Sequence, residues 1–270
     1  MRIIDCHCHV YPPTVAARAV RGVADFYDRE SSFGDGLAAS VMDLWKARKV
    51  DHAVVFSVAT KLSQVEHINS FIAKAVEEGG GFFTGLGTVH PDVPDMAKAV
   101  HDMLELGLKG VKLHPETQGC AVDDPRLLAL YDACPEDFPI LIHTGDFRYD
   151  MSNPDRTARI LKMFHHRTFI GAHFGGWSVW DEAVRTLHGF DNLYVDTSST
   201  FFWMSDHSKV RDYIRSYGSE KVLFGSDFPM WDVKPEIDDL LALKLRDDEY
   251  ENIFHRNAEK VFGIECGGAI

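Results

Sequence analysis

The sequence predicts an α/β protein folded as a single (β/α)8 TIM barrel. Two observations predict this fold class. Apolar, β-branched segments alternate with amphipathic segments along the whole chain, which is typical of parallel strands joined by helical crossovers. The chain of 270 residues is long for an ordinary domain but typical of one such barrel. Because no repeat or linker divides the chain, we expect one domain over residues 1–270.

Eight segments have the apolar character of buried parallel strands. In chain order they are residues 2–10, 51–58, 82–89, 108–114, 138–144, 168–173, 192–197 and 221–227. A doubly wound open sheet is the alternative, but it would carry a glycine-rich phosphate turn after its first strand. The residues that follow the first strand here read His-Cys-His-Val-Tyr-Pro-Pro, which favours the closed barrel.

Helices are expected between the strands, at residues 62–78, 95–106, 155–165, 177–187, 209–217 and 247–262. The longest segment without a clear pattern is 22–36, which follows the first strand. We expect it to be irregular and to form part of a lid or rim.

The composition excludes several classes of protein. The formal net charge is −13, which argues against nucleic acid or an anionic membrane as partner. No apolar run approaches the roughly 20 residues of a membrane helix, and the first residues do not resemble a signal peptide. Five cysteines do not suggest a disulfide framework. We therefore expect a soluble, cytoplasmic protein with a small-molecule substrate, and leave a homodimer open.

Several of the 14 histidines fall at predicted strand ends. His7 and His9 share a face of the first strand, His143 ends the fifth, His173 the sixth, and Asp227 the eighth. Functional groups of a barrel lie at the carboxyl ends of its strands, so these five side chains should converge at the mouth. A single histidine at a strand end is usually a hydrogen-bonded core residue, but five such groups together favour a metal site. Imidazoles and a carboxylate suit zinc, and also iron, nickel or manganese.

The alternation of side chains along the first strand gives two further expectations. Asp5 lies two residues before His7, so we expect its carboxylate on the same face, where it would orient a ligand imidazole. Cys6 and Cys8 should point the opposite way, towards the helices.

Five segments resemble the amidohydrolase superfamily. They are Ile-Asp-Cys-His-Cys-His at 4–9, Ile-His-Thr-Gly at 142–145, Gly-Ala-His-Phe-Gly-Gly at 171–176, Phe-Gly-Ser-Asp-Phe-Pro at 224–229, and the closing Asn-Ala-Glu-Lys-Val-Phe at 257–262. The resemblance is greatest to the amidohydrolase-related branch, which includes aminocarboxymuconate-semialdehyde decarboxylase. It covers nearly the whole chain in matching order. The branch contains hydrolases, decarboxylases and hydratases, so it does not define a substrate.

The resemblance implies roles for the strand-end residues. His7, His9, His143 and Asp227 would hold one divalent metal, for which Zn²⁺ is favoured, while His173 and Asp227 would act as catalytic residues that move protons. In binuclear members of the superfamily a carboxylated lysine of the fourth strand bridges two metals. Lys112 occupies that strand, so a second metal is an alternative.

Four residues are candidates for substrate binding, each with a structural alternative. Lys112 and His114 share a face of the fourth strand and would clamp a substrate carboxylate, unless Lys112 is structural or bridges metals. Arg148, beyond the fifth strand, would neutralise an anionic substrate or pair with a nearby aspartate. Trp203, in an aromatic segment after the seventh strand, would wall an apolar pocket or pack in the core. Asp196, which ends the seventh strand, is expected to have a polar structural role.

These expectations lead to a metal-dependent hydrolase, in which metal-activated water attacks an amide, ester or lactone carbonyl. The close alternative is a metal-dependent, non-oxidative decarboxylase (carboxy-lyase) of a small unsaturated or aromatic acid. A third is a non-catalytic metal- or ligand-binding barrel. The chain is shorter than the decarboxylases it resembles, which favours the hydrolase.

Overall fold

The computed structural model describes residues 1–265. All eight predicted strands form, and each is shorter than expected because only the paired middle of each apolar segment lies in the sheet. The strands are β1 (Ile4–His9), β2 (His52–Phe56), β3 (Phe83–Gly85), β4 (Val111–Leu113), β5 (Ile140–Ile142), β6 (Phe169–Gly171), β7 (Leu193–Asp196) and β8 (Val222–Leu223).

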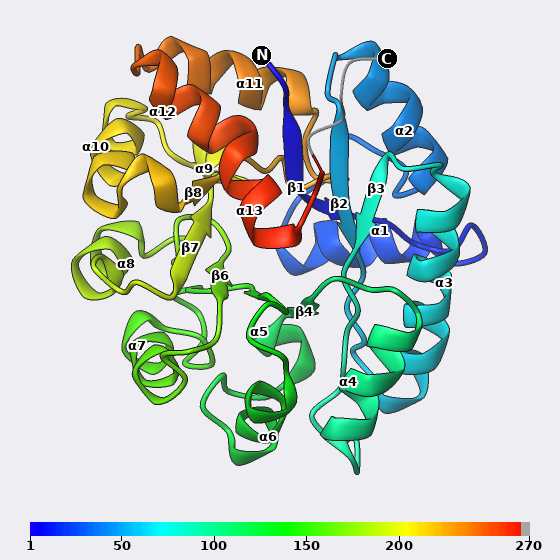
Figure 1. Cartoon of the computed structure of the whole chain (residues 1–270). Coiled ribbons are helices and arrows are strands. Elements are labelled where there is room, and N and C mark those ends of the chain that lie inside the picture. Colours follow the sequence, from blue (N-terminus) through cyan, green and yellow to red (C-terminus); the bar gives the residue numbers. More distant parts are fainter. Residues whose placement is uncertain (266–270) are drawn as a thin grey trace.

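The strands are all parallel and close into a ring. Hydrogen bonding gives a sheet in the order β1-β2-β3 and another in the order β4-β5-β6-β7-β8. Parallel bridges join Gly87 to Val111 at one seam and Cys8 to Phe228 at the other. Most of the helices lie outside this ring (Figure 1), which is the architecture of a (β/α)8 barrel.

Most predicted helices form near their expected positions. These are α3 (Val65–Glu78), α4 (Met96–Glu105), α7 (Pro154–Met163), α8 (Trp180–Leu187) and α10 (Ser208–Tyr217), while residues 247–262 divide into α12 (Asp247–Glu251), a π-helical segment (Asn252–Arg256) and α13 (Asn257–Phe262). The other helices are α1 (Ala16–Phe26), α2 (Ala38–Ala47), α5 (Pro115–Gln118), α6 (Pro125–Ala133), α9 (Thr200–Trp203) and α11 (Val233–Ala242).

Helix α1 corrects the expectation for residues 22–36, because it includes residues 22–26. Its start carries no recognisable capping signal: Val15 stands at the N-cap and makes no side-chain hydrogen bond to the helix. The amphipathic pattern of α1 places one side of the helix over the barrel mouth.

Two apolar layers hold the barrel together. The larger lies between strands and helices. The smaller fills the barrel interior with residues such as Ile4, Val54 and Leu141, and it includes Ala258 and Phe262 of α13. Helix α13 therefore closes the end of the barrel where the strands begin, and Figure 1 shows it near the middle of the ring.

A bulge in β1 corrects the predicted alternation of that strand. Asp5 pairs with Ala53, and Cys8 pairs with Val55. Between these two pairs β1 therefore advances by three residues while β2 advances by two, so β1 contains one extra residue. Cys6 consequently packs in the barrel interior rather than against the helices, whereas Cys8 faces the outer layer as expected.

The same bulge turns Asp5 away from the imidazoles. The Asp5 carboxylate accepts hydrogen bonds from the indole of Trp45, at 2.8 Å, and from the backbone N–H groups of His7 and Ser226, each at 3.0 Å. The expected contact with a ligand imidazole was wrong, because the strand is not regular between Asp5 and His7. Asp5 instead fixes the backbone that carries His7.

Within residues 1–265, no helix combines the length and hydrophobicity needed to cross a membrane.

Candidate metal centre

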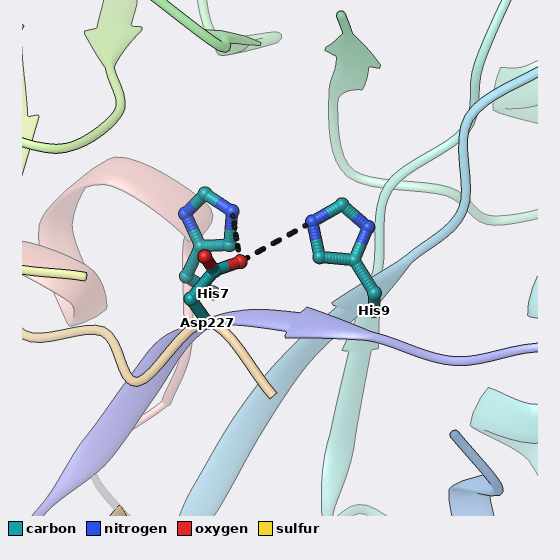
Figure 2. A group of neighbouring side chains, drawn as sticks. All are labelled: His7, His9 and Asp227. Carbon is teal, nitrogen blue, oxygen red and sulfur yellow. Dashed lines mark ion pairs between the residues drawn. The ribbon is translucent and has the colours of Figure 1, made fainter. Parts of the chain in front are cut away.

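His7, His9 and Asp227 converge at the carboxyl end of the barrel. Asp227 Oδ1 lies 3.5 Å from the Nε2 atom of each imidazole (Figure 2). One ligand atom from each of the three side chains falls within 4.8 Å of the others. Asp227 adopts a left-handed backbone conformation, with φ at 68°, directly after the strand-eight segment. The structure therefore brings these three residues together, as expected from the sequence.

Asp196 orients the His7 imidazole. Its Oδ2 atom lies 2.8 Å from His7 Nδ1, and both side chains are buried. Because a carboxylate only accepts, Nδ1 carries the proton and the lone pair of Nε2 faces the Asp227 carboxylate. From the sequence we expected only a polar structural role for Asp196. Its position at the end of β7 was the one feature that indicated a place near the ligands.

Ser199 and Trp231 orient the Asp227 carboxylate. The Ser199 hydroxyl donates to Asp227 Oδ2 and accepts a hydrogen bond from the Trp231 indole at 2.8 Å. Oδ1 is thereby left facing the two imidazoles. Burial raises the pKa of Asp227, and the Lys112 ammonium opposes that rise.

His143 and His173 form a second pair beside these ligands. The His173 Nδ1 atom lies 2.9 Å from the Ser198 carbonyl oxygen, which only accepts, so Nδ1 carries the proton. His173 Nε2 then accepts from His143 Nδ1 at 3.1 Å, which leaves a lone pair on His143 Nε2. Burial lowers the pKa of His173 to about 3. Both histidines line the same cavity as His9 and Asp227.

His143 does not complete a compact set with His7, His9 and Asp227. It lies instead within 4.8 Å of ligand atoms of His114 and Glu116. Its ring stacks on that of His114, with centroids 4.0 Å apart and planes at 6°. Parallel stacked rings direct their lone pairs side by side, which does not suit a shared ion, and we treat this second group as a wall of the cavity.

Tyr27 was not found from the sequence. Its hydroxyl lies 3.2 Å from His114 Nε2 and 3.5 Å from His143 Nε2. The residue follows α1 and enters the site only because α1 crosses the mouth, which no local pattern around Tyr27 indicates.

Lys112 lies beside the ligand atom of His7 and outside the cavity lining. Its side chain is buried, with Nζ 3.3 Å from His7 Nε2 and 5.0 Å from the centre of the Phe56 ring. Burial lowers the pKa of Lys112 to about 8. His114, by contrast, lines the cavity as expected for a substrate contact.

Arg148 and Trp203 lie away from the cavity lining. The Arg148 guanidinium makes two hydrogen bonds to Asp146 and donates to the Phe26 carbonyl oxygen at 2.7 Å, which secures the end of α1. Trp203 packs edge-on against Trp177, with ring centroids 5.7 Å apart. Arg148 therefore pairs with a nearby aspartate and Trp203 packs against another aromatic ring, which are the structural alternatives to the expected substrate contacts.

The ligand cluster opens into a cavity of about 610 Å³ between α1 and the start of α3. Its lining is mainly apolar and aromatic beyond the histidine cluster. The part of the lining away from the ligands includes Val15, Arg18, Ala19, Gly22, Val23, Phe26, Tyr27, Val58, His67 and Ile68.

The donor set fits a divalent metal. His7 is held in the tautomer with an unprotonated Nε2, and Asp227 keeps one oxygen for the ion. Two imidazoles with a carboxylate suit zinc, manganese or ferrous iron. The lone pair of His143 Nε2 belongs to the neighbouring group, 3.5 Å from the Tyr27 hydroxyl.

Comparison with known proteins supports the fold. No curated protein matches the chain at a significant level. Among the solved structures, an uncharacterised TIM-barrel protein from Bordetella bronchiseptica has a TM-score of 0.81 and 21% identity, covering 97% of this chain and 99% of that one.

Two named enzymes share the fold at low identity. A 5-carboxyvanillate decarboxylase from Novosphingobium aromaticivorans, complexed with manganese and 4-hydroxy-3-methoxy-5-nitrobenzoic acid, has a TM-score of 0.77, with 18% identity over 97% of this chain and 96% of that one. A Pseudomonas putida protein provisionally assigned as a 2-pyrone-4,6-dicarboxylic acid hydrolase has a TM-score of 0.68, with 18% identity over 98% of both chains. The alignment covers almost all of the decarboxylase chain. The expectation that the shorter length of this protein favours a hydrolase therefore does not hold.

A family model described as Amidohydrolase matches residues 4–264, nearly the whole chain. The match includes every candidate ligand and every barrel strand. The protein belongs to the amidohydrolase family.

Proposed function

We propose that this protein is a metal-dependent, non-oxidative decarboxylase of a planar aromatic or unsaturated acid. The observation that carries the proposal is the shape of the cavity beside the ligands. His114 and His143 stack face to face, and Phe26 stands edge-on to His114 with centroids 5.7 Å apart. Together with Tyr27, which is tilted against His143, these rings wall the cavity. Flat aromatic walls suit a planar ring better than a tetrahedral carbonyl adduct.

His7, His9 and Asp227 would hold the metal, and zinc and manganese both suit this donor set. When bound, the ion would supply a Lewis acid that polarises substrate oxygens and lowers the pKa of water. The protein side chains direct its position: Asp196 holds His7, and Ser199 holds Asp227.

The reaction needs one proton delivered to carbon. The substrate R–COO⁻ takes up H⁺ at the carbon that bears the carboxylate, the C–C bond breaks, and R–H and CO₂ form. Asp227 lies at the cavity surface and would transfer that proton, and His173 would take part through His143, to which its Nε2 atom is hydrogen-bonded. The apolar lining removes water from the carboxylate, which favours its loss as a neutral gas.

Relatives in structure support the choice. The decarboxylase from Novosphingobium aromaticivorans binds manganese and a substituted benzoic acid on the same fold. That enzyme is named for 5-carboxyvanillate, which carries a hydroxyl group beside its 5-carboxylate. A planar acid with an oxygen substituent beside its carboxylate is therefore the first substrate class to test.

A hydrolase is the second candidate, and two linked hydrogen bonds favour it. The bond from His143 to His173 and the bond from His173 to the Ser198 carbonyl fix the tautomer of both imidazoles at the cavity surface. The lone pair left on His143 Nε2 would accept a proton from attacking water. The fold shared with the Pseudomonas putida protein is consistent with this reaction.

Isotope labelling of the product distinguishes the two reactions. The manganese- or zinc-loaded protein is incubated with 5-carboxyvanillate, 2,6-dihydroxybenzoate and 2-pyrone-4,6-dicarboxylate in D₂O and, separately, in H₂¹⁸O. Decarboxylation places one deuterium on the carbon that lost CO₂ and adds no ¹⁸O to the remaining product. Hydrolysis adds ¹⁸O and releases no CO₂, and that result would overturn the proposal.

The control is His173→Asn, which should retain the metal but lose turnover by about a hundredfold or more, because the proton-transfer group is absent. If no compound is converted, and if His173→Asn binds the acids as tightly as the native chain does, the results would support a non-catalytic binding role instead.

A further inference from the structure

The cavity is larger than a single-ring acid requires. A cavity of about 150 Å³ is enough for benzene, whereas this one measures about 610 Å³. It lies within the range of roughly 300–1,000 Å³ that is typical of sites for larger ligands. A ring seated beside the metal ligands would leave most of the volume unfilled.

The unused part of the cavity runs along α1. Pocket-lining positions recur along this helix at Val15, Ala19, Gly22, Val23 and Phe26, with the spacing of one helical face. Val58 and Ile68, from the other side of the cavity, add to this lining. We call this apolar part the distal arm. Its surface would bind an alkyl or similar apolar chain.

Arg18, an exposed residue of α1, lies near the end of the distal arm away from Tyr27. Nine residues separate Arg18 from Tyr27, a rise of about 13 Å along a helix. Within residues 1–265, Arg18 has no ion-pair or hydrogen-bond partner, and His67 lines the cavity as well. Among the described lining residues, Asp227 is the one carboxylate, and it belongs to the ligand cluster. The far end of the arm is therefore suited to an anion.

We propose that the natural substrate carries an apolar tail with a terminal acidic group, the tail lying in the distal arm and the acid reaching Arg18. The inference rests on the proposed function, because the reacting ring must sit at the metal centre. It goes beyond that function by naming a substrate with two separated acidic ends.

Three matched probes test the arm by binding rather than turnover. The first is 4-hydroxy-3-methoxy-5-nitrobenzoic acid. In the second the methoxy group is lengthened to hexyloxy, and in the third to 5-carboxypentyloxy. Affinities for the manganese-loaded full chain are measured by calorimetry. We expect the hexyloxy compound to bind about tenfold or more tightly than the methoxy compound, and the terminal carboxylate to add about two- to fivefold.

Two variants and their controls locate the tail. A Cβ added at Gly22 meets no atom within 4 Å, so Gly22→Trp can fill the arm without disturbing the helix. It should return the ratio of hexyloxy to methoxy affinity to about one, while Ala17→Trp, on the same helix outside the lining, should keep the gain. Arg18→Gln should remove only the gain from the carboxylate. The matched control is Arg21→Gln, because Arg21 pairs with Asp25 and lies outside the lining.

The outcomes separate the two proposals. Tail gains that disappear in Gly22→Trp and Arg18→Gln but persist in the controls support the inference. Equal affinities of the three probes for the native chain overturn the inference and leave the proposed decarboxylase standing. Failure of the methoxy compound to bind, together with a hydrolytic product in the labelling experiment, overturns both.

Discussion

The imidazole of His7 and the carboxylate of Asp196 meet at 2.8 Å, joining the end of β1 to the end of β7 in a fully buried ion-pair geometry. This contact fixes both the tautomer and the direction of a metal ligand. We expect Asp196→Asn to weaken metal affinity by about 10- to 100-fold, because the amide cannot raise the basicity of His7 as a carboxylate does. Competition with a chromophoric chelator measures the change.

The control for Asp196→Asn is Asp191→Asn, an exposed acid at the start of the same strand region. It removes the same charge far from the ligands and should leave metal affinity within about twofold. Equal loss in both variants would show that net charge, and not the contact with His7, supports binding.

Ser199 should contribute to both metal binding and stability. Ser199→Ala removes the donor to Asp227 Oδ2 and the acceptor for the buried Trp231 indole. We expect about a tenfold loss of metal affinity and about 1–3 kcal/mol of unfolding free energy in metal-free protein. Urea denaturation measures the second effect. Trp231→Phe, which removes the unsatisfied donor and keeps an aromatic ring, should restore part of the stability of Ser199→Ala but not its metal affinity.

His52 should make stability depend on pH. Burial lowers the pKa of its imidazole from 6.5 to about 4, and the nearby Arg2 charge acts in the same direction. The unfolded chain therefore takes up a proton more readily than the folded chain. The contribution of His52 is fully present above pH 6.5 and falls as the pH drops towards 4, by up to about 3 kcal/mol.

The measurement compares native protein with His52→Asn by urea denaturation from pH 7.5 to 4, in the presence of a chelator so that metal loss does not contribute. The native chain should lose more stability than the variant across this window. Parallel curves would contradict the prediction, as would a native curve that rises on acidification.

One divalent metal per chain is expected, with Lys112 unmodified. The two histidines that a second metal would need, His143 and His173, are hydrogen-bonded to each other at 3.1 Å, and Lys112 Nζ faces His7 instead. Elemental analysis together with the intact mass under native conditions checks this. His7→Ala should lower the metal content towards zero. Two metals and a mass increase equal to carbon dioxide on Lys112 would contradict it.

Strand ends were the most predictable part of the site. Parallel strands of a barrel all finish at one mouth, so the order of strands alone brings His9, His143, His173 and Asp227 to a common cavity. The family resemblance then suggested a role for each residue. The order of strands and the family resemblance do not depend on exact strand boundaries. The site prediction was therefore not affected by predicting strands that are several residues too long.

Contacts set by irregular backbone could not be predicted in this way. The bulge in β1 reversed the expected direction of Asp5 and Cys6, and nothing in their residue types indicates an extra residue in that strand. Tyr27 reaches the site through the path of α1 across the mouth, which is a tertiary property. Arg148 illustrates a third limit. The sequence shows that a cation lies near the mouth, but it does not show that Arg148 pairs with Asp146 and stabilises the loop rather than binding a ligand.

The closure of the barrel by Ala258 and Phe262 has a consequence for the order of events in turnover. Packed side chains block passage through the barrel axis, so entry and departure share the opening beside α1. A remaining product would have to vacate that opening before another molecule arrives. Product inhibition should therefore be competitive, and its strength should increase with the part of the product that the distal arm retains.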